Sequence, residues 1–295
     1  MSESAPGSPR YIEALNHQVV RMLDLPHDRH PEFAEDCLHD PWSLAAHWKN
    51  EVCVKAVNSV MHSHLVQQDG TVVDDQHDLL GLFSPALEEH EDNIIQVQYR
   101  RGRDNTARPN FTLLHELGHY LQQTDDELVT RLFSITDLNL DKKLEEEACN
   151  RFAAVALLPT NYVNDVRRGG AIDARMVNYI FEKGREDPDP NIVRVSRPAI
   201  VRRMADFLEY PGFVALVQGR KVKVRAHRDG TVSFDDELMA VERTMIDAFH
   251  NRKRVKDNDV VKLWTTEEGE PVFSSLALSR SGRQIQYFIV VQFVQ

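Results

Sequence analysis

The sequence contains few cysteines, no long apolar run and no excess of positive charge. Its 295 residues include three cysteines, Cys37, Cys53 and Cys149, which form no C-x-x-C pair. A low, odd number of cysteines favours a reducing compartment over a disulfide framework. The longest apolar runs, 153–158 and 287–291, are far shorter than the roughly 20 residues of a membrane-spanning helix. The N-terminus also lacks the apolar centre of a signal peptide, so we expect a cytoplasmic protein.

The net charge of −11 disfavours a general nucleic-acid-binding surface, because contacts with phosphates require a basic face. This charge is unevenly distributed. Residues 213–295 carry 13 Lys and Arg against 11 Asp and Glu, so the negative charge lies in the preceding part. The chain is long enough for two domains, and the asymmetry predicts two units of different character. Nothing in the sequence indicates an oligomeric state.

Hydrophobic periodicity predicts helices and short strands in the first part of the chain. Apolar residues recur at helical spacing in residues 11–25, and a shorter helix is expected at 41–49. Strands are expected at 52–57, 79–83 and 93–99, with a polar turn between the last two. This region therefore combines helices with a small sheet.

The most informative stretch contains His115, Glu116 and His119 in the spacing H-E-x-x-H. On a helix, positions i and i+4 lie one turn apart on the same face. Two imidazoles held in this way can bind one tetrahedral zinc ion, and the glutamate beside the first can reach a water molecule on the metal. The helix is expected to begin after Asn110 as its N-cap. Gly118 in its interior indicates the close approach of another segment, which we expect to be a strand.

A zinc site of this kind requires a third protein ligand. The short completion H-E-x-x-H-x-x-G-x-x-H is absent, because Gln122 and Asp125 stand at its glycine and final histidine positions. A later helix, predicted for residues 144–158 and ended by Pro159, offers Glu146 on a face with small residues. Glutamates at a helix start also stabilise the helix dipole, but the upstream motif favours the ligand interpretation.

Two blocks of sequence together resemble the ImmA/IrrE metallopeptidases, the DUF955 group. The blocks are Asn110-Phe-Thr-Leu-Leu-His-Glu-Leu-Gly-His-Tyr-Leu and Glu146-Glu-Ala-Cys-Asn-Arg-Phe-Ala-Ala-Val-Ala-Leu-Leu-Pro. The resemblance implies a mainly helical, zincin-like metallopeptidase domain with a small sheet. It also implies that Zn²⁺ is held by His115, His119 and Glu146, and that Glu116 is the catalytic carboxylate.

Neighbours of Glu146 carry further expectations. Glu145 and Glu147 are its register alternatives, and the helix phase places Glu145 away from the face of Asn150. Asn150, one turn after Glu146, is predicted to orient a metal ligand from outside the coordination sphere. Cys149 is expected to be a small packed side chain and not a zinc thiolate.

A weaker resemblance to the same family covers residues 195–208, with Ser196 as the N-cap of a helix. This helix is similar to the recognition helix of a helix-turn-helix, and Arg197, Arg202 and Arg203 would suit phosphates. Its apolar residues also need to be covered, so we prefer packing as the explanation. Direct binding of nucleic acid is not expected.

A second metal site is conceivable among the histidines of the first part of the chain. Nine histidines fall between His17 and His90, including His62 and His64 two residues apart. No pair of them is four residues apart, as in H-E-x-x-H, so we favour the interpretation as solvated surface histidines over a metal site.

The predicted fold class is α+β, with a second α+β domain at the C-terminus. In this C-terminal domain we expect several strands joined by hairpin turns, and a helix at 236–250. The chain is expected to divide into four segments: a disordered tail (1–10), a zincin-like metallopeptidase domain (11–165), a helical extension (166–211) and a C-terminal domain suited to sensing or partner binding (212–295).

The resemblance implies a zinc endopeptidase that cleaves a helix-turn-helix repressor and so relieves repression in a stress response or a mobile element. Substrate peptide is expected to add as a strand beside residues 93–99. The alternative is a binding module that keeps the zinc fold and acts by protein–protein contact. Glu116 favours the enzyme, because a binding module needs no base there. A metal-free structural helix would leave both matching blocks unexplained.

Overall fold

The structure is a computed structural model, and its parts with described placement cover most of the chain. The described residues are 8–60, 80–86, 91–99, 107–134, 138–186, 195–233, 236–251, 259–265, 271–281 and 284–294. Most of the tail expected at 1–10, the histidines His62 and His64, and the centre of the turn expected at 88–92 lie outside these ranges.

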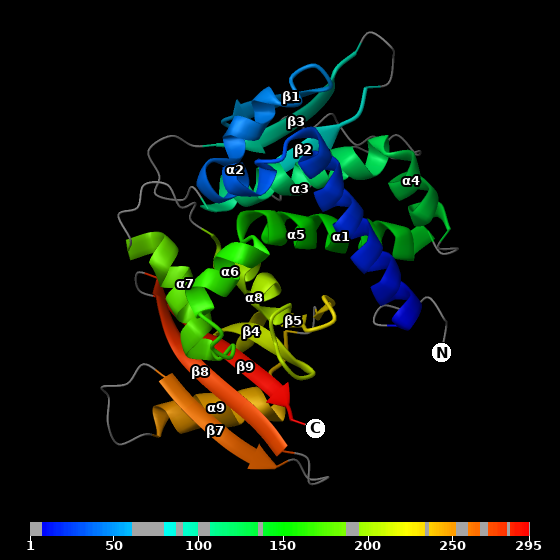
Figure 1. The fold of residues 1–295 in the computed structure, drawn as a ribbon. Helices are drawn as coiled ribbons and strands as arrows, with labels where there is room; N and C mark the ends of the chain where they lie inside the picture. Colours follow the sequence, from blue (N-terminus) through cyan, green and yellow to red (C-terminus); the bar gives the residue numbers. More distant parts are fainter. Residues whose placement is uncertain are drawn as a thin grey trace, which may run out of the picture.

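The N-terminal half consists of helices beside a small sheet (Figure 1). Its elements are α1 (Pro9–Arg29), α2 (Phe33–His39), the 3-10 helix η1 (Pro41–Ala46), β1 (Val52–Val57), β2 (Gly81–Ser84), β3 (Asn93–Gln98), α3 (Ala107–Thr124), α4 (Asp126–Phe133) and α5 (Leu138–Leu157). The sheet has the order β1-β3-β2, with β1 parallel and β2 antiparallel to β3. The central strand β3 is thus paired on both sides, and β1 and β2 are its edges.

The core of this half lies where α1, α3 and α5 pack together. Apolar stripes on α3 and α5 face this core, because period 3.6 places residues at i, i+3 and i+4 on one side of a helix. Their fully or nearly buried members are Leu114, Leu117, Leu121, Leu144, Ala148 and Phe152. The packing of α3 on α5 fixes the relative position of the two sequence blocks.

The C-terminal half is built on a six-stranded sheet, seen below the N-terminal half in Figure 1. Its elements are α6 (Thr160–Arg167), α7 (Ala174–Glu186), α8 (Arg197–Ala205), β4 (Gly212–Gln218), β5 (Lys221–His227), β6 (Val232–Ser233), α9 (Ala240–His250), β7 (Asp259–Thr265), β8 (Pro271–Ser281) and β9 (Gln284–Phe293). The strand order is β6-β5-β4-β9-β8-β7, and every pairing is antiparallel. The predicted α+β fold class is confirmed.

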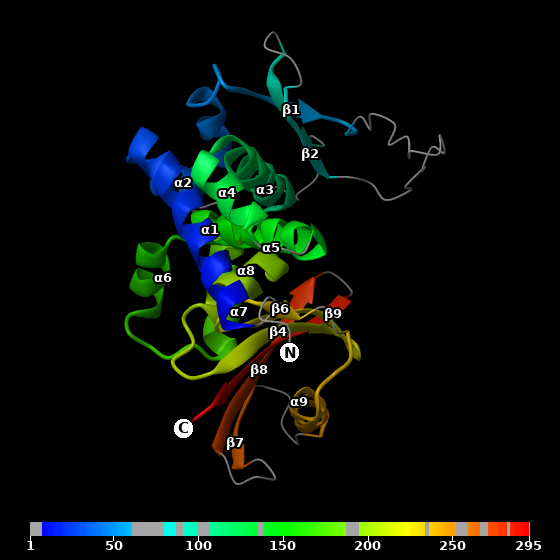
Figure 2. The same cartoon turned by 90° about the vertical axis from the view of Figure 1, so that its right-hand side faces the viewer.

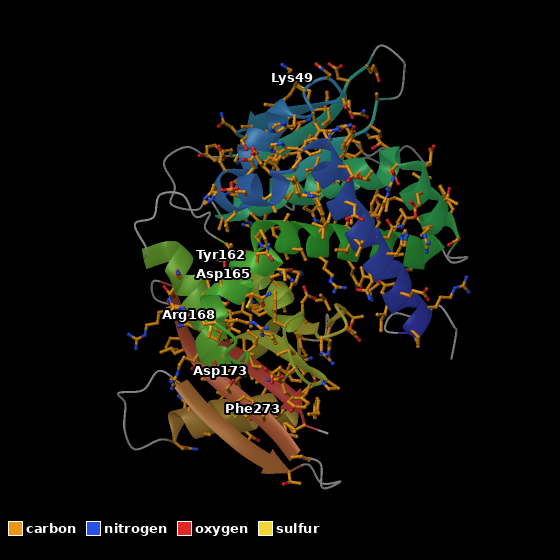
Figure 3. All side chains as sticks on the ribbon, viewed as in Figure 1. Lys49, Tyr162, Asp165, Arg168, Asp173 and Phe273 are labelled. Carbon is orange, nitrogen blue, oxygen red and sulfur yellow. The ribbon has the colours of Figure 1, made fainter. Side chains whose placement is uncertain are left out.

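Helices cover both faces of this sheet (Figure 2). Helices α7 and α8 pack on one face, and α9 packs on the other. Arg225 of β5 joins α9 to the sheet through two hydrogen bonds to the carboxylate of Glu242, at 3.0 Å and 2.6 Å. Both side chains are buried. Before α7, Arg168 ends α6 in the left-handed conformation, with φ of 48° (labelled in Figure 3).

Helix α8 joins the two halves, because it packs against α5 on one side and against β4 and β5 on the other. Ser196 caps it, as predicted, and accepts a hydrogen bond from the amide of Ala199. Arg203 is only 4% exposed and donates to the carbonyl of Leu158 and to Asp206. This arginine therefore serves packing between helices, and it is not available to a phosphate backbone.

Several elements differ from the expectations. Helix α1 begins at Pro9, inside the expected tail, because Ser8 caps it and accepts from the amide of Tyr11. The helix expected at 41–49 is the shorter 3-10 helix η1, and the helix expected from 236 begins at Ala240. Helices α2, α4 and α6 and strand β7 were not predicted, because each is short and its burial is decided by tertiary packing.

Asn110 is not an N-cap, because α3 begins three residues earlier, at Ala107. Its side chain is buried and accepts a hydrogen bond from the indole nitrogen of Trp42 at 2.9 Å. This contact joins η1 to the first turns of α3. None of the helices among the described residues is long and apolar enough to cross a membrane.

Candidate metal centre

Helix α3 places the side chains of His115 and His119 on one face, one turn apart. Their Nε2 atoms are 3.2 Å apart, and both lie close to the carboxylate of Glu146 on α5. Oε2 of Glu146 is 3.4 Å from Nε2 of His115, and Oε1 is 3.4 Å from Nε2 of His119. The structure thus brings the three predicted ligands together.

These separations fit a zinc ion. A tetrahedral ion with ligand distances of 2.0–2.1 Å places neighbouring ligand atoms about 3.4 Å apart. The three observed separations, 3.2 Å, 3.4 Å and 3.4 Å, match this edge length without a rearrangement of the backbone. Glu146 is 58% exposed, so the side of the cluster that it borders is open to solvent. Its contacts with the two histidines hold its carboxyl pKa well below the usual range.

Glu145 supports the cluster from behind. Its Oε1 lies 2.8 Å from Nδ1 of His119, and it also accepts a hydrogen bond from Gln123 at 3.2 Å. A donor at Nδ1 leaves the lone pair of Nε2 directed at the metal position, so this contact selects the tautomer that binds metal. Burial is the largest single influence and opposes ionisation of Glu145, but the hydrogen bond and charge of His119 and the hydrogen bond from Gln123 together outweigh it and lower the pKa.

The two histidines are supported unequally. Nδ1 of His115 is buried and has no hydrogen-bond partner among the described residues. Its ring instead stacks against the side chain of Phe111, at 6.3 Å between centroids. Helix packing and this aromatic contact hold His115, whereas a carboxylate holds His119.

Glu116 points to the sheet, and its side chain is 8% exposed. Burial raises its pKa, and His115, His119 and the amide of Phe83, which donates to the carboxylate, offset part of this effect. Strand β2 approaches this carboxylate closely. A Cβ atom on Gly81 would lie 2.6 Å from Oε1 of Glu116, so only glycine fits beside it.

Gly118 allows α3 and α5 to approach each other. A Cβ atom at this position would lie 3.0 Å from Sγ and 3.3 Å from Cα of Cys149. The expectation that a strand passes Gly118 is therefore wrong, and α5 occupies that place. Cys149 is fully buried, and its sulfur accepts a hydrogen bond from Gln122 at 3.0 Å, in agreement with a packed side chain.

Asn150 lies one turn after Glu146, and its amide donates to the backbone oxygen of Glu146 at 2.8 Å. This hydrogen bond contacts the backbone of α5 and not the carboxylate of Glu146. The side chain that orients a ligand, His119, is Glu145, and the sequence did not reveal this role. Glu145 and Glu146 point in different directions from α5. Both still contact His119, because an imidazole ring has one nitrogen on each side.

The expected position for a substrate strand is wrong, because β3 is paired with β1 and β2 along both of its edges. Strand β2 is the edge strand that contacts α3. It carries Gly81 and Phe83, the two residues beside the carboxylate of Glu116. The edge of β2 is therefore the one next to the cluster.

Comparisons with known proteins agree with this description. Residues 93–176 match the family model of the IrrE N-terminal-like domain, Peptidase_M78, which includes β3, α3 and α5 up to the start of α7. No curated protein sequence matches the chain closely enough to count as a relative. Among solved structures, a Mycobacterium tuberculosis transcriptional regulator has a similar fold, with a TM-score of 0.52. The two proteins are 11% identical over 96% of this chain and 80% of the other, so the likeness concerns the fold alone.

The matched segment holds His115, Glu116, His119 and Glu146, and it ends before the six-stranded sheet. The predicted resemblance to the ImmA/IrrE metallopeptidases is thereby confirmed. Residues 93–176 are therefore similar to the IrrE N-terminal-like domain of the Peptidase_M78 family, and this similarity supports a metallopeptidase.

Proposed function

We propose that this protein is a zinc-dependent endopeptidase. The observation that carries the proposal is the triangle formed by His115, His119 and Glu146, whose edges match those of a tetrahedral zinc site. Two imidazoles and one carboxylate are a donor set of catalytic zinc sites, which leave one position open. Zinc held there supplies a Lewis acid that activates water and polarises a scissile carbonyl.

Glu116 is the residue that moves the proton. It follows His115 directly, and its buried carboxylate is held by the amide of Phe83. A carboxylate in this position accepts a proton from the attacking water and delivers it to the leaving amine. Because Gly81 leaves no free volume beside Oε1, the carboxylate is fixed in place before substrate arrives.

Substrate peptide adds to the exposed edge of β2. Strand addition uses backbone hydrogen bonds, so it accepts many sequences, and side-chain pockets then supply specificity. This edge lies next to Glu116, which brings a peptide bond to the cluster. The edge of β2 thus takes the place of the edge of β3, where the sequence suggested that substrate would add.

The substrate class that we propose is a helix-turn-helix transcriptional repressor, cleaved in a stress response or in the control of a mobile element. Support for this class is the resemblance to the ImmA/IrrE metallopeptidases, since no contact in the chain identifies a substrate. Arg203 is committed to packing, and the net charge is −11, so the proposed partner is a protein and not a nucleic acid.

The test pairs the full chain with a helix-turn-helix regulator, taken from the neighbouring gene if that gene encodes one. Wild-type protein loaded with zinc should cleave the regulator at one site. Glu116→Gln should retain the metal at the cluster, measured by elemental analysis, and should lose cleavage by at least about 100-fold, because the proton acceptor is removed. If Glu116→Gln relieves repression as well as wild type does, the protein acts by binding and the peptidase proposal is wrong.

A further inference from the structure

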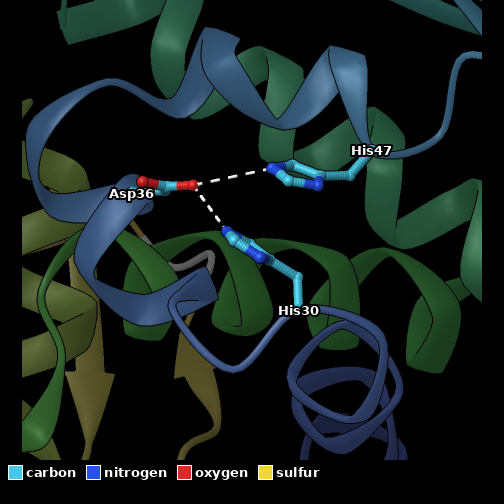
Figure 4. Close-up of side chains that lie close together, drawn as sticks. All are labelled: His30, Asp36 and His47. Atoms are coloured by element: carbon cyan, nitrogen blue, oxygen red, sulfur yellow. Dashed lines mark hydrogen bonds and ion pairs between the residues drawn. The ribbon is translucent and has the colours of Figure 1, made fainter.

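A second cluster of metal-ligating side chains lies at the junction of α1, α2 and η1 (Figure 4). His30 directly follows α1, Asp36 lies in α2, and His47 directly follows η1. Nε2 of His30 is 2.7 Å from Oδ2 of Asp36, and Nε2 of His47 is 3.8 Å from the same oxygen. The three ligand atoms all lie within 4.8 Å of one another.

The donor set suits a transition-metal site. The separation of 3.8 Å between His47 and Asp36 is near the edge length of about 3.4 Å expected for a tetrahedral ion with these ligands. The separation of 2.7 Å between His30 and Asp36 is a hydrogen bond, which a bound ion would replace. Imidazole suits zinc, copper, iron and nickel, whereas magnesium and calcium prefer an all-oxygen shell. The set of two histidines and one carboxylate is the same as at the candidate metal centre on α3 and α5.

The backbone holds the three residues in place. The amide of His30 donates to the carbonyl of Pro26 at 2.8 Å, and the amide of His47 donates to the carbonyl of Leu44 at 2.9 Å. Asp36 is held by its helix, whose end is closed by the amide of Asp40. Because the backbone of each ligand is fixed at or near the end of a helix, binding of an ion has to order only the side chains.

The two imidazole rings lie on the same side of Asp36. The rings of His30 and His47 are stacked, with centroids 3.8 Å apart and an angle of 21° between their planes. Because an imidazole binds a metal ion in the plane of its ring, one of the two rings turns about its side-chain bonds when both Nε2 atoms bind the same ion. Both direct Nε2 at the same oxygen of Asp36 (Figure 4). The side chain of His47 is 36% exposed and that of Asp36 is 32% exposed, so an ion can enter from solvent and water can complete its coordination.

We propose that His30, Asp36 and His47 bind a second divalent transition-metal ion, Zn²⁺ or a similar ion, separate from the catalytic cluster. The ion joins the end of α1 to α2 and to η1. It thereby stabilises the position of η1, whose Trp42 donates to Asn110 in the first turns of α3. The site is structural, because its ligands come from elements that carry none of the residues of the catalytic cluster.

The experiment measures zinc binding by calorimetry to full-length protein that has been freed of metal with a chelator. We expect two zinc ions for wild type and one for His30→Gln/His47→Gln. The matched control is His27→Gln/His39→Gln, which removes two exposed histidines of the same helices and should still bind two ions. The proposal is overturned if the His30→Gln/His47→Gln variant and the control bind equal numbers of ions, whatever the number for wild type.

A second measurement separates this site from the proposed catalytic one. In a His115→Gln/His119→Gln background, zinc should raise the melting temperature, because an ion that binds only the folded state stabilises it. The shift should disappear when His30→Gln and His47→Gln are added. Cleavage of substrate should persist in His30→Gln/His47→Gln, whereas loss of cleavage in Glu116→Gln concerns only the catalytic cluster. A zinc-induced shift that is the same with and without His30 and His47 rules out the second site.

Discussion

Nδ1 of His119 lies 2.8 Å from a carboxylate oxygen of Glu145, while Nε2 of the same ring lies 3.4 Å from the carboxylate of Glu146. Two consecutive glutamates of α5 thus contact opposite nitrogens of one imidazole. Glu146 is placed to bind a metal ion together with His119, and Glu145 fixes the tautomer of His119 that can bind this ion. The packing of α5 on α3 creates this arrangement.

We predict that Glu145→Gln lowers zinc affinity at the cluster by about 10–100-fold, the usual effect of removing a carboxylate behind a metal-binding histidine. The measurement is a competition titration with a chromophoric chelator. Glu147→Gln is the control, because this neighbouring carboxylate accepts from the hydroxyl of Tyr11 at 2.7 Å and faces α1. Equal zinc affinities for the two variants would show that Glu145 does not orient His119.

Gly81→Ala should reduce kcat for substrate cleavage by about 100-fold with little change in zinc content, because displacement of a catalytic group by about 1 Å has an effect of that size. The new Cβ would lie 2.4 Å from Cγ2 of Thr112 and 2.6 Å from Oε1 of Glu116, so the carboxylate must move. Gly219→Ala is the control: its methyl group would meet open space, and the backbone strain from the positive φ of 62° lies at a turn outside the cluster. A Gly81→Ala enzyme with wild-type kcat would contradict the assigned position of Glu116.

Glu242→Gln should lower the free energy of unfolding by about 3–5 kcal/mol, because it leaves the charge of Arg225 buried and unpaired. Arg225 is 1% exposed and makes two hydrogen bonds to this carboxylate. Arg225→Met/Glu242→Leu, which removes both charges, should be closer to wild type than either single variant. Urea unfolding measures all three, and strictly additive losses would show that the two residues are not coupled.

The C-terminal half should lose stability as the pH falls below about 6.5, the usual pKa of histidine in an unfolded chain. Burial lowers the pKa of His227 in the folded state, and Arg225 acts in the same direction, whereas Asp229 and Glu242 oppose the shift. Below this pH the unfolded chain binds a proton at His227 more readily than the folded state does. The contribution of neutral His227 to stability is therefore present at higher pH and decreases on acidification. In His227→Gln, urea unfolding at pH 7.5 and 5.5 should show a smaller difference than in wild type. If the difference is the same in His227→Gln as in wild type, groups other than His227 cause the pH dependence. The control is His27→Gln, which removes an exposed histidine.

Local patterns in the sequence determined the helices that carry the candidate metal centre. The spacing of His115 and His119 is a property of one helix, and the apolar stripe of α5 set the phase of Glu146 within another. Both helices form over the predicted residues, although α3 begins at Ala107 and α5 at Leu138, earlier than expected. The family match to residues 93–176 covers both. A period of 3.6 residues can be read from sequence because neighbours along the chain generate it.

Only the tertiary structure decided which elements meet. It placed α5 and not a strand beside Gly118, put Gly81 of β2 against Glu116, and paired β3 along both edges. It also brought His30, Asp36 and His47 together, although their spacing along the chain follows no helical or strand period. Such contacts depend on how helices turn back on one another and on the shared core that holds them, and no local pattern of residues encodes that packing.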